Sequence, residues 1–214
     1  CIRDRGYTYR IPTYTDLYYR DSTTQGDANL DPEEAIAEEL GLKYMTKNVT
    51  ASIALFNRDA DKLIDYIKEN ETDLWQATNI RALNTKGLEL NTNFIFKIGA
   101  RNQELNLGYT FLEDDLANLD VNFSRYAINS LKHHFTSRLS TSFIQNISQN
   151  IVYKYAERAN GQSYTVVDAS INLALKAFEI SVIANNIFNT EYYETNLVPM
   201  PKGNVLFGLT YNFK

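Results

Sequence analysis

The side chains best suited to catalysis or metal binding are few in this sequence, and their spacing is unfavourable. His133 and His134 are the only histidines. Adjacent residues of a strand point to opposite faces, so this pair would not hold one metal ion together. The sequence has no Gly-x-Ser-x-Gly motif, and no Ser, His and Asp are spaced to suggest a catalytic triad. We therefore expect no catalytic residues and predict that the chain is not an enzyme.

Acidic residues form a short run at 113–115, at the start of a predicted long loop. Asp114 and Asp115 would supply the carboxylate oxygens that Ca²⁺ prefers. This run is the candidate for a calcium site in an extracellular loop, and the alternative is an acidic loop in contact with solvent. We expect no other cofactor, because no Cys and His spacing resembles a zinc site.

Aromatic residues in the predicted loops are the better candidates for ligand contact. Large flat ligands are typically held by aromatic and polar side chains. The alternative is that these rings pack on one another and fold the loops. The candidates in the loops are Tyr14, Tyr18, Tyr19, Tyr192 and Tyr193, and a further candidate, Trp75, lies near the end of a long predicted strand.

The composition favours strands and turns over helices. The 214 residues include 15 Tyr, 11 Phe and 23 Asn, and aromatic residues make up 13% of the chain. The formal net charge of -5 argues against nucleic-acid binding, which requires a basic surface. A mean hydropathy of -0.36 and the absence of long apolar stretches exclude a helical membrane protein. They do not exclude a membrane barrel, whose strands alternate lipid-facing and lumen-facing residues.

Apolar and polar residues alternate along most of the chain after about residue 35, which is the pattern of strands with one apolar face. The alternation predicts nine antiparallel strands and a polar loop over residues 1–35. The predicted strands are 36–46, 49–66, 74–97, 103–113, 131–144, 147–157, 163–175, 178–187 and 203–213.

Two further features favour a membrane barrel over a soluble β-sandwich. Short links near 47–48, 97–103, 145–146 and 176–177 alternate with longer ones near 66–73, 113–128, 157–163 and 186–202. Short turns at one end and long loops at the other are the arrangement of outer-membrane barrels. The stretches 49–68 and 74–97 are also far longer than the strands of about five or six residues that are usual in a sandwich.

Several motifs, in this order, resemble a signature series of TonB-dependent outer-membrane receptors. Residues 10–19 read RIPTYTDLYY, residues 29–33 read NLDPE, and residues 39–44 read ELGLKY. Near the end of the chain, residues 185–194 read NNIFNTEYYE, which is similar to the family's penultimate segment. The resemblance covers nearly the whole chain.

The resemblance implies the C-terminal part of a receptor barrel that usually has 22 strands and encloses a plug domain, which we expect to be absent from this chain. Such a protein lies in the bacterial outer membrane and imports a bulky scarce nutrient, here a corrinoid such as cobalamin or a ferric siderophore. The implied partners are the lipid bilayer, the ligand, the plug and the TonB complex that supplies energy. Lumen-facing residues of the last strands are candidates for contact with the plug, and the alternative is that they only line a water-filled interior: Glu179, Asn185, Asn204 and Asn212.

The alternative hypothesis is a soluble or surface β-sheet module that binds or adheres without transport. The two hypotheses differ in where the apolar face lies. A membrane barrel exposes it to lipid as a belt, whereas a soluble module buries it between two sheets.

Overall fold

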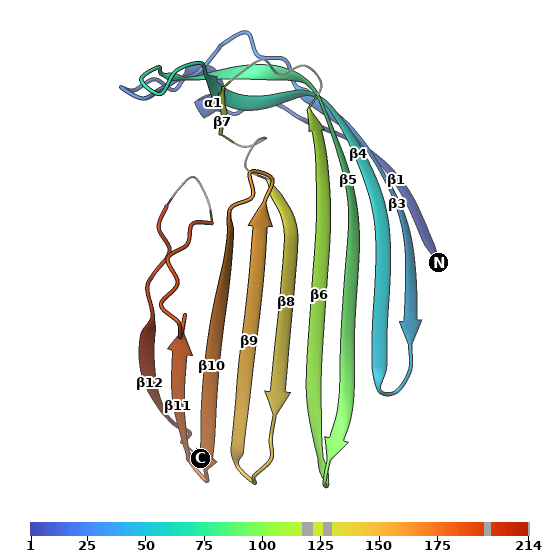
Figure 1. Cartoon of the computed structure of the whole chain (residues 1–214), viewed down its shortest axis with the longest axis vertical. Helices are drawn as coiled ribbons and strands as arrows, with labels where there is room; N and C mark the ends of the chain where they lie inside the picture. Colours follow the sequence, from blue (N-terminus) through green and yellow to red (C-terminus); the bar gives the residue numbers. More distant parts are fainter. Residues whose placement is uncertain (117–121, 126–129, 195–197, 214) are drawn as a thin grey trace.

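The computed structural model describes residues 1–116, 122–125, 130–194 and 198–213. They form one large sheet, one short helix and the connecting loops (Figure 1). The elements are β1 (Ile2–Arg10), α1 (Tyr14–Tyr18), β2 (Thr24–Gln25), β3 (Glu33–Met45), β4 (Val49–Lys68), β5 (Trp75–Ile98), β6 (Arg101–Leu116), β7 (Phe123–Ser124), β8 (Leu131–Thr141), β9 (Ile147–Arg158), β10 (Ser163–Leu175), β11 (Phe178–Asn185) and β12 (Asn204–Tyr211).

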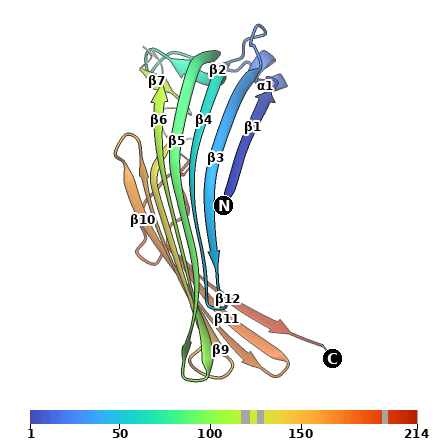
Figure 2. The same ribbon diagram turned by 90° about the vertical axis from the view of Figure 1, so that its right-hand side faces the viewer.

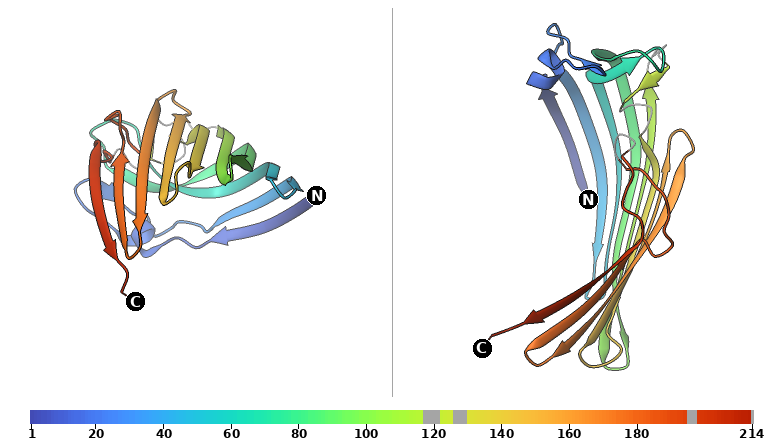
Figure 3. Two further views of the ribbon diagram at one scale, coloured as in Figure 1. Left: turned by 90° about the horizontal axis from the view of Figure 1, so that it is seen from below. Right: turned by 90° about the vertical axis from the view of Figure 1, so that its left-hand side faces the viewer.

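The sheet joins each long strand to its neighbour in the sequence. Its order is β1-β3-β4-β5-β6-β8-β9-β10-β11-β12, and every pairing along this path is antiparallel. The two-residue strands lie off the path, where β2 pairs with β5 and β7 pairs with β4. Seen from below, the sheet curves into an open trough with β1 and β12 at its two edges (Figure 3). This is the all-β antiparallel architecture predicted from the sequence.

The connections fall into two groups at opposite ends of the strands. Tight links at 46–48, 99–100, 142–146 and 176–177 form the short-turn end. Left-handed backbone conformations shape three of these turns, at Gly99, Asn146 and Lys176. The opposite end, which we call the long-loop end, carries residues 11–32, 69–74, 159–162, 186–194 and 198–203, and it holds α1, β2 and β7 (Figures 1 and 2).

One face of the sheet is apolar from β3 to β12. Cross-strand pairing places residues of successive strands in rows, and one such row runs Phe94, Leu105, Leu139, Ile151 and Ala169. The side chains between these positions point to the other face, which is rich in Asn, Ser, Thr and Glu. Phe207 and Leu209 of β12 are 80% and 71% exposed, so nothing in the described chain covers the apolar face there.

The apolar face has the height of a membrane belt. On β5 it extends from Leu88 to Ile98, which corresponds to about 33 Å of strand and about 25 Å along the membrane normal for a typical barrel tilt. Aromatic rings lie near both limits. Tyr109 and His133 are joined by a hydrogen bond of 2.8 Å toward the long-loop end, and Phe178 packs on Tyr211 at 4.8 Å near the short-turn end.

The buried core of the described chain is small and lies toward the long-loop end. Its cluster consists of Ala35, Ala60 and Leu83, with Leu63 packed against it. A soluble sandwich of this size would bury its apolar rows between two sheets, but the described residues form one sheet. No helix in the described part of the chain is long and apolar enough to cross a membrane.

The prediction of a loop over residues 1–35 was wrong at both ends. Residues 2–10 form β1, which pairs with β3 along its whole length, and β3 begins at Glu33. The prediction failed because β1 is a sheet edge whose side chains are all exposed, so it lacks the alternation of an apolar face. The nine predicted strands correspond to β3, β4, β5, β6, β8, β9, β10, β11 and β12, and the sheet has twelve strands in all among the described residues.

Candidate functional site

The first long loop, residues 11–32, is tied to the sheet through the Arg10 guanidinium. This group donates two hydrogen bonds to Glu33, from Nε to Oε2 at 2.8 Å and from Nη2 to Oε1 at 2.7 Å. It also donates from Nη1 to Oδ2 of Asp16 at 3.2 Å. Glu33 Oε1 accepts a further bond from the backbone N–H of Ile64 at 2.7 Å. The guanidinium therefore joins the end of β1, the helix α1 and the starting point of β3.

Asp16 is the buried carboxylate around which α1 is built. It forms a capping box with Thr13, whose backbone N–H and hydroxyl donate to Asp16 Oδ2 at 2.9 and 2.8 Å. The Tyr66 hydroxyl donates to Oδ1 at 3.1 Å. Burial raises the pKa of Asp16, but these bonds and the Arg10 charge more than offset it, so the pKa lies below its ordinary value. Asp16 is therefore held as a carboxylate.

Gly26 allows the first loop to fold back on α1. A Cβ atom at this position would lie 2.6 Å from the backbone oxygen of Asp16 and 2.9 Å from the carbonyl carbon of Leu17. The backbone N–H of Gly26 donates to the Tyr19 oxygen at 2.7 Å. Only glycine fits so close an approach of two backbone segments.

Trp75 lies between two cations at the beginning of β5. Lys68 Nζ is 4.8 Å from its ring centre, and Arg125 Cζ is 4.8 Å away as well. The Trp75 backbone N–H donates to the Thr23 oxygen at 2.8 Å, which joins this residue to the first loop. Trp75 was predicted to contact ligand. In the structure its ring packs against Lys68 of β4 and Arg125, whose backbone N–H donates to the Tyr66 oxygen of β4.

The predicted tyrosines of the first loop are open to solvent. Tyr14 and Tyr18 are 77% and 58% exposed, and their ring centres are 5.2 Å apart. The Tyr19 hydroxyl donates to Asp21 Oδ2 at 2.9 Å. The pairing of β2 with β5 places Thr24, which follows these tyrosines in the first loop, beside Trp75. Their role in ligand contact stays a prediction.

The last long loop brings the predicted Tyr192 against the polar face of β9 and β10. The Tyr192 ring packs on Tyr164 at 4.7 Å. Lys154 Nζ lies 5.5 Å from the Tyr164 ring and 5.2 Å from the Tyr192 ring. The same ammonium group forms an ion pair with Glu194, and the Tyr164 hydroxyl donates to Glu194 Oε1 at 3.4 Å. We call these four residues the Lys154 cluster.

A cavity of about 250 Å³ adjoins the Lys154 cluster and is lined in part by Tyr164, Tyr192, Tyr193 and Glu194. Arg158 Nη2 donates to the Tyr193 oxygen at 3.3 Å and also to the Glu194 oxygen, which fixes the loop backbone at the cavity. The hydrogen bond from Lys154 is the largest influence on the pKa of Glu194, which lies below its ordinary value. Aromatic rings, the Arg158 guanidinium and the Glu194 carboxylate therefore line one concave place at the long-loop end, next to Lys154.

Asp114 and Asp115 lie in β6 rather than in a loop, which contradicts the position predicted for a calcium site. Asp114 pairs with Thr85, whose hydroxyl donates to its Oδ1 at 2.6 Å, and Asp115 pairs with Asn84. Adjacent strand residues point to opposite faces, so the two carboxylates do not converge on one ion. The described residues contain no group of three or more His, Cys, Asp or Glu side chains placed to hold a metal ion.

The four predicted plug-facing residues lie at the β11–β12 edge, at positions that belong to the polar face. Glu179 pairs with Thr210, and Asn185 pairs with Asn204, whose Oδ1 accepts a 3.0 Å hydrogen bond from Asn185 Nδ2. Asn212 follows β12, and its backbone N–H donates to the Ala177 oxygen at 2.8 Å. Contact of these residues with a plug stays a prediction.

The residues that organise both loops are not among the candidates predicted from the sequence. Arg10, Asp16 and Glu33 lie inside the quoted motifs, and their charges signal a buried ion-pair network once the loop and the strand are placed together. Lys154 interrupts the Asn and Ser pattern of its face, which was the available signal for it. The structure brings Tyr192 into this site. It brings Tyr14 and Tyr18 together in α1, and it packs Trp75 against Lys68 and Arg125.

Comparisons with known proteins identify what the chain resembles. The model of a family described as "TonB dependent receptor-like, beta-barrel" matches residues 6–187. The vitamin B12 transporter BtuB of Vibrio vulnificus is 24% identical over 198 residues, which cover 89% of this chain and 30% of that protein. The vitamin B12 transporter BtuB of Photobacterium profundum is 26% identical over 213 residues, which cover 89% of this chain and 34% of that protein.

Solved structures share the fold at lower identity. The copper transporter OprC has a TM-score of 0.76 at 14% identity, and the match covers 99% of this chain and 36% of OprC. The siderophore receptor PirA from Acinetobacter baumannii has a TM-score of 0.71 at 15% identity, covering 99% of this chain and 38% of PirA. This chain therefore spans about a third of the length of the curated relatives.

Proposed function

The chain belongs to the TonB-dependent receptor β-barrel family, whose members are proteins of the outer membrane of Gram-negative bacteria, and from this membership we propose that it forms part of an outer-membrane active transporter. In this proposal the ten long strands supply one part of the barrel wall. The long-loop end faces the outside and captures a bulky scarce nutrient. The energy for import comes from the TonB complex, and a plug domain closes the barrel.

One observation supports the proposal most directly, the separation of an apolar face from a polar face over the nine long strands from β3 to β12. Spanning structures in lipid must pair all their backbone groups, and a closed antiparallel barrel does this with strands. The apolar face then meets lipid, and the polar face lines the interior. The edges β1 and β12 are open here, so the remaining strands of the barrel would have to pair with them.

The Lys154 cluster is the part of the ligand surface that we propose on structural grounds. Tyr164 and Tyr192 offer stacked aromatic faces, and Lys154 and Glu194 offer a cation and a carboxylate beside them. Such a set suits a large ligand with a flat conjugated part and peripheral amide, hydroxyl or carboxylate groups. Tyr193 borders the same cavity.

For the substrate we propose a corrinoid such as cobalamin. The curated relatives named above are vitamin B12 transporters, and a corrinoid has the flat ring and peripheral amides that the Lys154 cluster suits. A ferric siderophore is the second candidate, because the structural neighbours include siderophore receptors.

Binding measured with the full receptor that contains this chain tests the choice of substrate. Purified receptor in detergent is titrated with cyanocobalamin and, separately, with ferric catecholate and ferric hydroxamate siderophores. Saturable cyanocobalamin binding alone supports the corrinoid, and binding of a siderophore alone replaces it. If none of these ligands binds saturably, the proposal of corrinoid or siderophore import is overturned.

Energy dependence is tested by uptake in cells. Labelled ligand should accumulate in cells that carry the TonB complex, and accumulation should fall to the level of surface binding when the complex is deleted or the proton gradient is dissipated. Undiminished accumulation without TonB would exclude active import and leave passive diffusion.

A further inference from the structure

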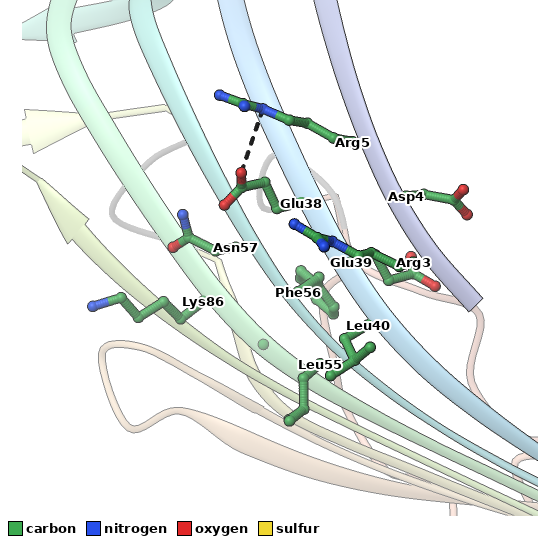
Figure 4. Close-up of a pocket in the computed structure, with 11 residues that line it drawn as sticks. Arg3, Asp4, Arg5, Glu38, Glu39, Leu40, Leu55, Phe56, Asn57 and Lys86 are labelled. Carbon is green, nitrogen blue, oxygen red and sulfur yellow. Dashed lines mark ion pairs between the residues drawn. The ribbon is translucent and has the colours of Figure 1, made fainter. Parts of the chain in front are cut away.

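A groove of about 750 Å³ crosses β1, β3, β4 and β5 near the upper limit of the apolar belt. It lies well away from the Lys154 cluster, which belongs to β9, β10 and the last loop. Figure 4 shows its residues, with Arg5 and Lys86 on one side of the ribbon and Asp4 on the other. The lining residues are Arg3, Asp4, Arg5, Glu38, Glu39, Leu40, Leu55, Phe56, Asn57, Lys86 and Gly87.

The register shows that the groove opens on the apolar, outward face of the sheet. Arg3, Leu40 and Leu55 form one row of outward side chains, and Arg5, Glu38, Asn57 and Lys86 form the next row toward the long-loop end. The row between them, which contains Glu39 and Phe56, points to the polar face and supplies only the floor of the groove. The neighbouring rows of the polar face do not line it.

The two walls differ in polarity. Leu40 and Leu55 are 51% and 53% exposed, and the apolar rows continue below them through Leu42 and Ile53. Arg3 stands at the β1 end of this wall, and the other wall carries the charged and amide groups of Arg5, Glu38, Asn57 and Lys86. The groove therefore lies where the hydrocarbon region of the membrane gives way to the headgroup region of the outer leaflet.

The charge in the groove is predominantly positive. Arg3 and Arg5 are two residues apart on the same face of β1, so their Cα atoms lie about 7 Å apart along the strand. Lys86 adds a third cation from β5. Glu38 is the one carboxylate among the outward side chains that line the groove, and it pairs with Arg5 Nε at 3.3 Å in an exposed ion pair. An exposed pair of this kind is weak and yields readily to a stronger anion.

We propose that this groove binds the phosphorylated headgroup of an outer-leaflet glycolipid of the lipid A type. The guanidinium groups of Arg3 and Arg5 hold one phosphate, because guanidinium matches phosphate oxygens with paired N–H donors. Lys86 contributes a point charge at the other end of the groove. The acyl chains descend over Leu40 and Leu55 onto the apolar belt.

Direct binding to the full receptor tests the proposal. Delipidated receptor is titrated with nanodiscs of phosphatidylcholine that contain either lipid A with both phosphates or fully dephosphorylated lipid A. We expect phosphorylated lipid A to bind with higher affinity, and the double variant Arg3→Ala with Arg5→Ala to weaken this binding on the order of tenfold. Arg5→Lys should retain most of the affinity, and Lys86→Ala should weaken it less than the double variant.

Two further variants separate a specific groove from general surface charge. Glu38→Gln removes the carboxylate that competes for Arg5 and should strengthen binding. Lys47→Ala removes an exposed cation at the short-turn end of the same hairpin and should leave binding unchanged. Heat-modifiable mobility on a gel verifies that every variant keeps a folded barrel.

Three results would overturn the proposal. They are equal affinity for phosphorylated and dephosphorylated lipid A, an equal loss with Lys47→Ala and with the double arginine variant, and full displacement of the lipid by millimolar inorganic phosphate. The last result would assign the groove to a free anion. Because none of these measurements uses the transported ligand, their outcome is independent of the proposed transport.

Discussion

At the scale of single residues, Arg10 is the centre of the first loop. Its guanidinium joins Asp16 and Glu33, both of which are largely buried. Removing one partner of such a network leaves a buried charge without compensation, which costs far more than an exposed ion pair contributes. Charged residues of the RIPTYTDLYY and NLDPE motifs thus bind each other.

This network predicts a pH dependence of the first loop. For both Asp16 and Glu33, burial raises the pKa, but hydrogen bonds and the Arg10 charge bring it below the ordinary values of 3.8 and 4.5. A carboxylate with a lowered pKa in the folded state stabilises the fold above its unfolded pKa, and this stability is lost as the pH falls through the folded pKa. We expect the loop to loosen progressively below about pH 4.5.

A nitroxide label on Ser22→Cys, with the exposed Cys1 replaced by Ser, measures the mobility of this loop directly, since Ser22 is exposed within it. The pH at which the loop becomes mobile should shift in the variant Asp16→Asn, because the side chain at this position can no longer titrate. Asp31→Asn is the matched control, because the Asp31 carboxylate is exposed and forms only a surface pair with Lys62. A loop whose mobility is constant from pH 7 to pH 3 would contradict the prediction.

Gly87 gives a second prediction at this scale. The Phe56 ring lies across Gly87 on the polar face, so a Cβ atom there would lie 2.2 Å from Phe56 Cζ. Gly87→Ala must displace the ring, and we expect a loss of about 1–3 kcal/mol in the free energy of unfolding. Urea unfolding in lipid vesicles measures it. Phe56→Leu in the same chain should restore part of the loss, and a Gly87→Ala variant as stable as the parent would refute the packing.

At the scale of elements, the last loop is held on β9 and β10 by one ammonium group. Lys154 pairs with Glu194 and lies beside the rings of Tyr164 and Tyr192. We expect Lys154→Met to raise the pKa of Glu194, to release the loop and to weaken ligand binding at least tenfold. Limited proteolysis near residue 194 and ligand titration measure the two effects.

Lys202→Met is the matched control for this variant. Lys202 pairs with Glu191 of the same loop at 2.6 Å, but both side chains are well exposed. This variant should change neither proteolysis nor binding to a comparable extent. If the two variants behave alike, general loop charge and not the Lys154 cluster determines the position of the loop.

Sequence patterning predicted the strands whose apolar side faces lipid. Strand β10 was predicted at its observed bounds, 163–175, and the bounds of the other eight differ by a few residues. The period of two is strong there because every second side chain must be apolar. Strand β1 carries Arg3 and Arg5 on its outward face, so the same rule failed for it.

The site was harder to predict than the strands because it depends on contacts between distant segments. Tyr192 was a candidate by its aromatic character, but its partners Lys154 and Tyr164 come from two other elements. No local pattern encodes that meeting. Asp114 and Asp115 illustrate the opposite error, since an acidic pair resembles a loop ligand set but here belongs to a strand that extends beyond the membrane belt.

At the scale of the whole molecule, the apolar face predicts a sharp difference between adjacent positions. Leu139 of β8 lies in the middle row of the apolar face, and Ser140 points to the polar face. We expect Leu139→Arg to lower the free energy of unfolding by about 2–4 kcal/mol in a bilayer, and Ser140→Arg to change it by much less. Refolding into lipid vesicles measures both, and equal effects would contradict a lipid-facing role for this side of the sheet.

The order of the strands in the sheet has a kinetic consequence. Each long strand pairs with the one that precedes it in the chain, so the contacts are local for a β protein. A hairpin, once formed, exposes an edge on which the next strand can add after closing only a short loop, and the sheet can grow like a zipper. The slow steps should be the two additions that must first close residues 11–32 and 186–203. The loops that offer the best surfaces for capturing a ligand are thus also the ones that delay the growth of the wall.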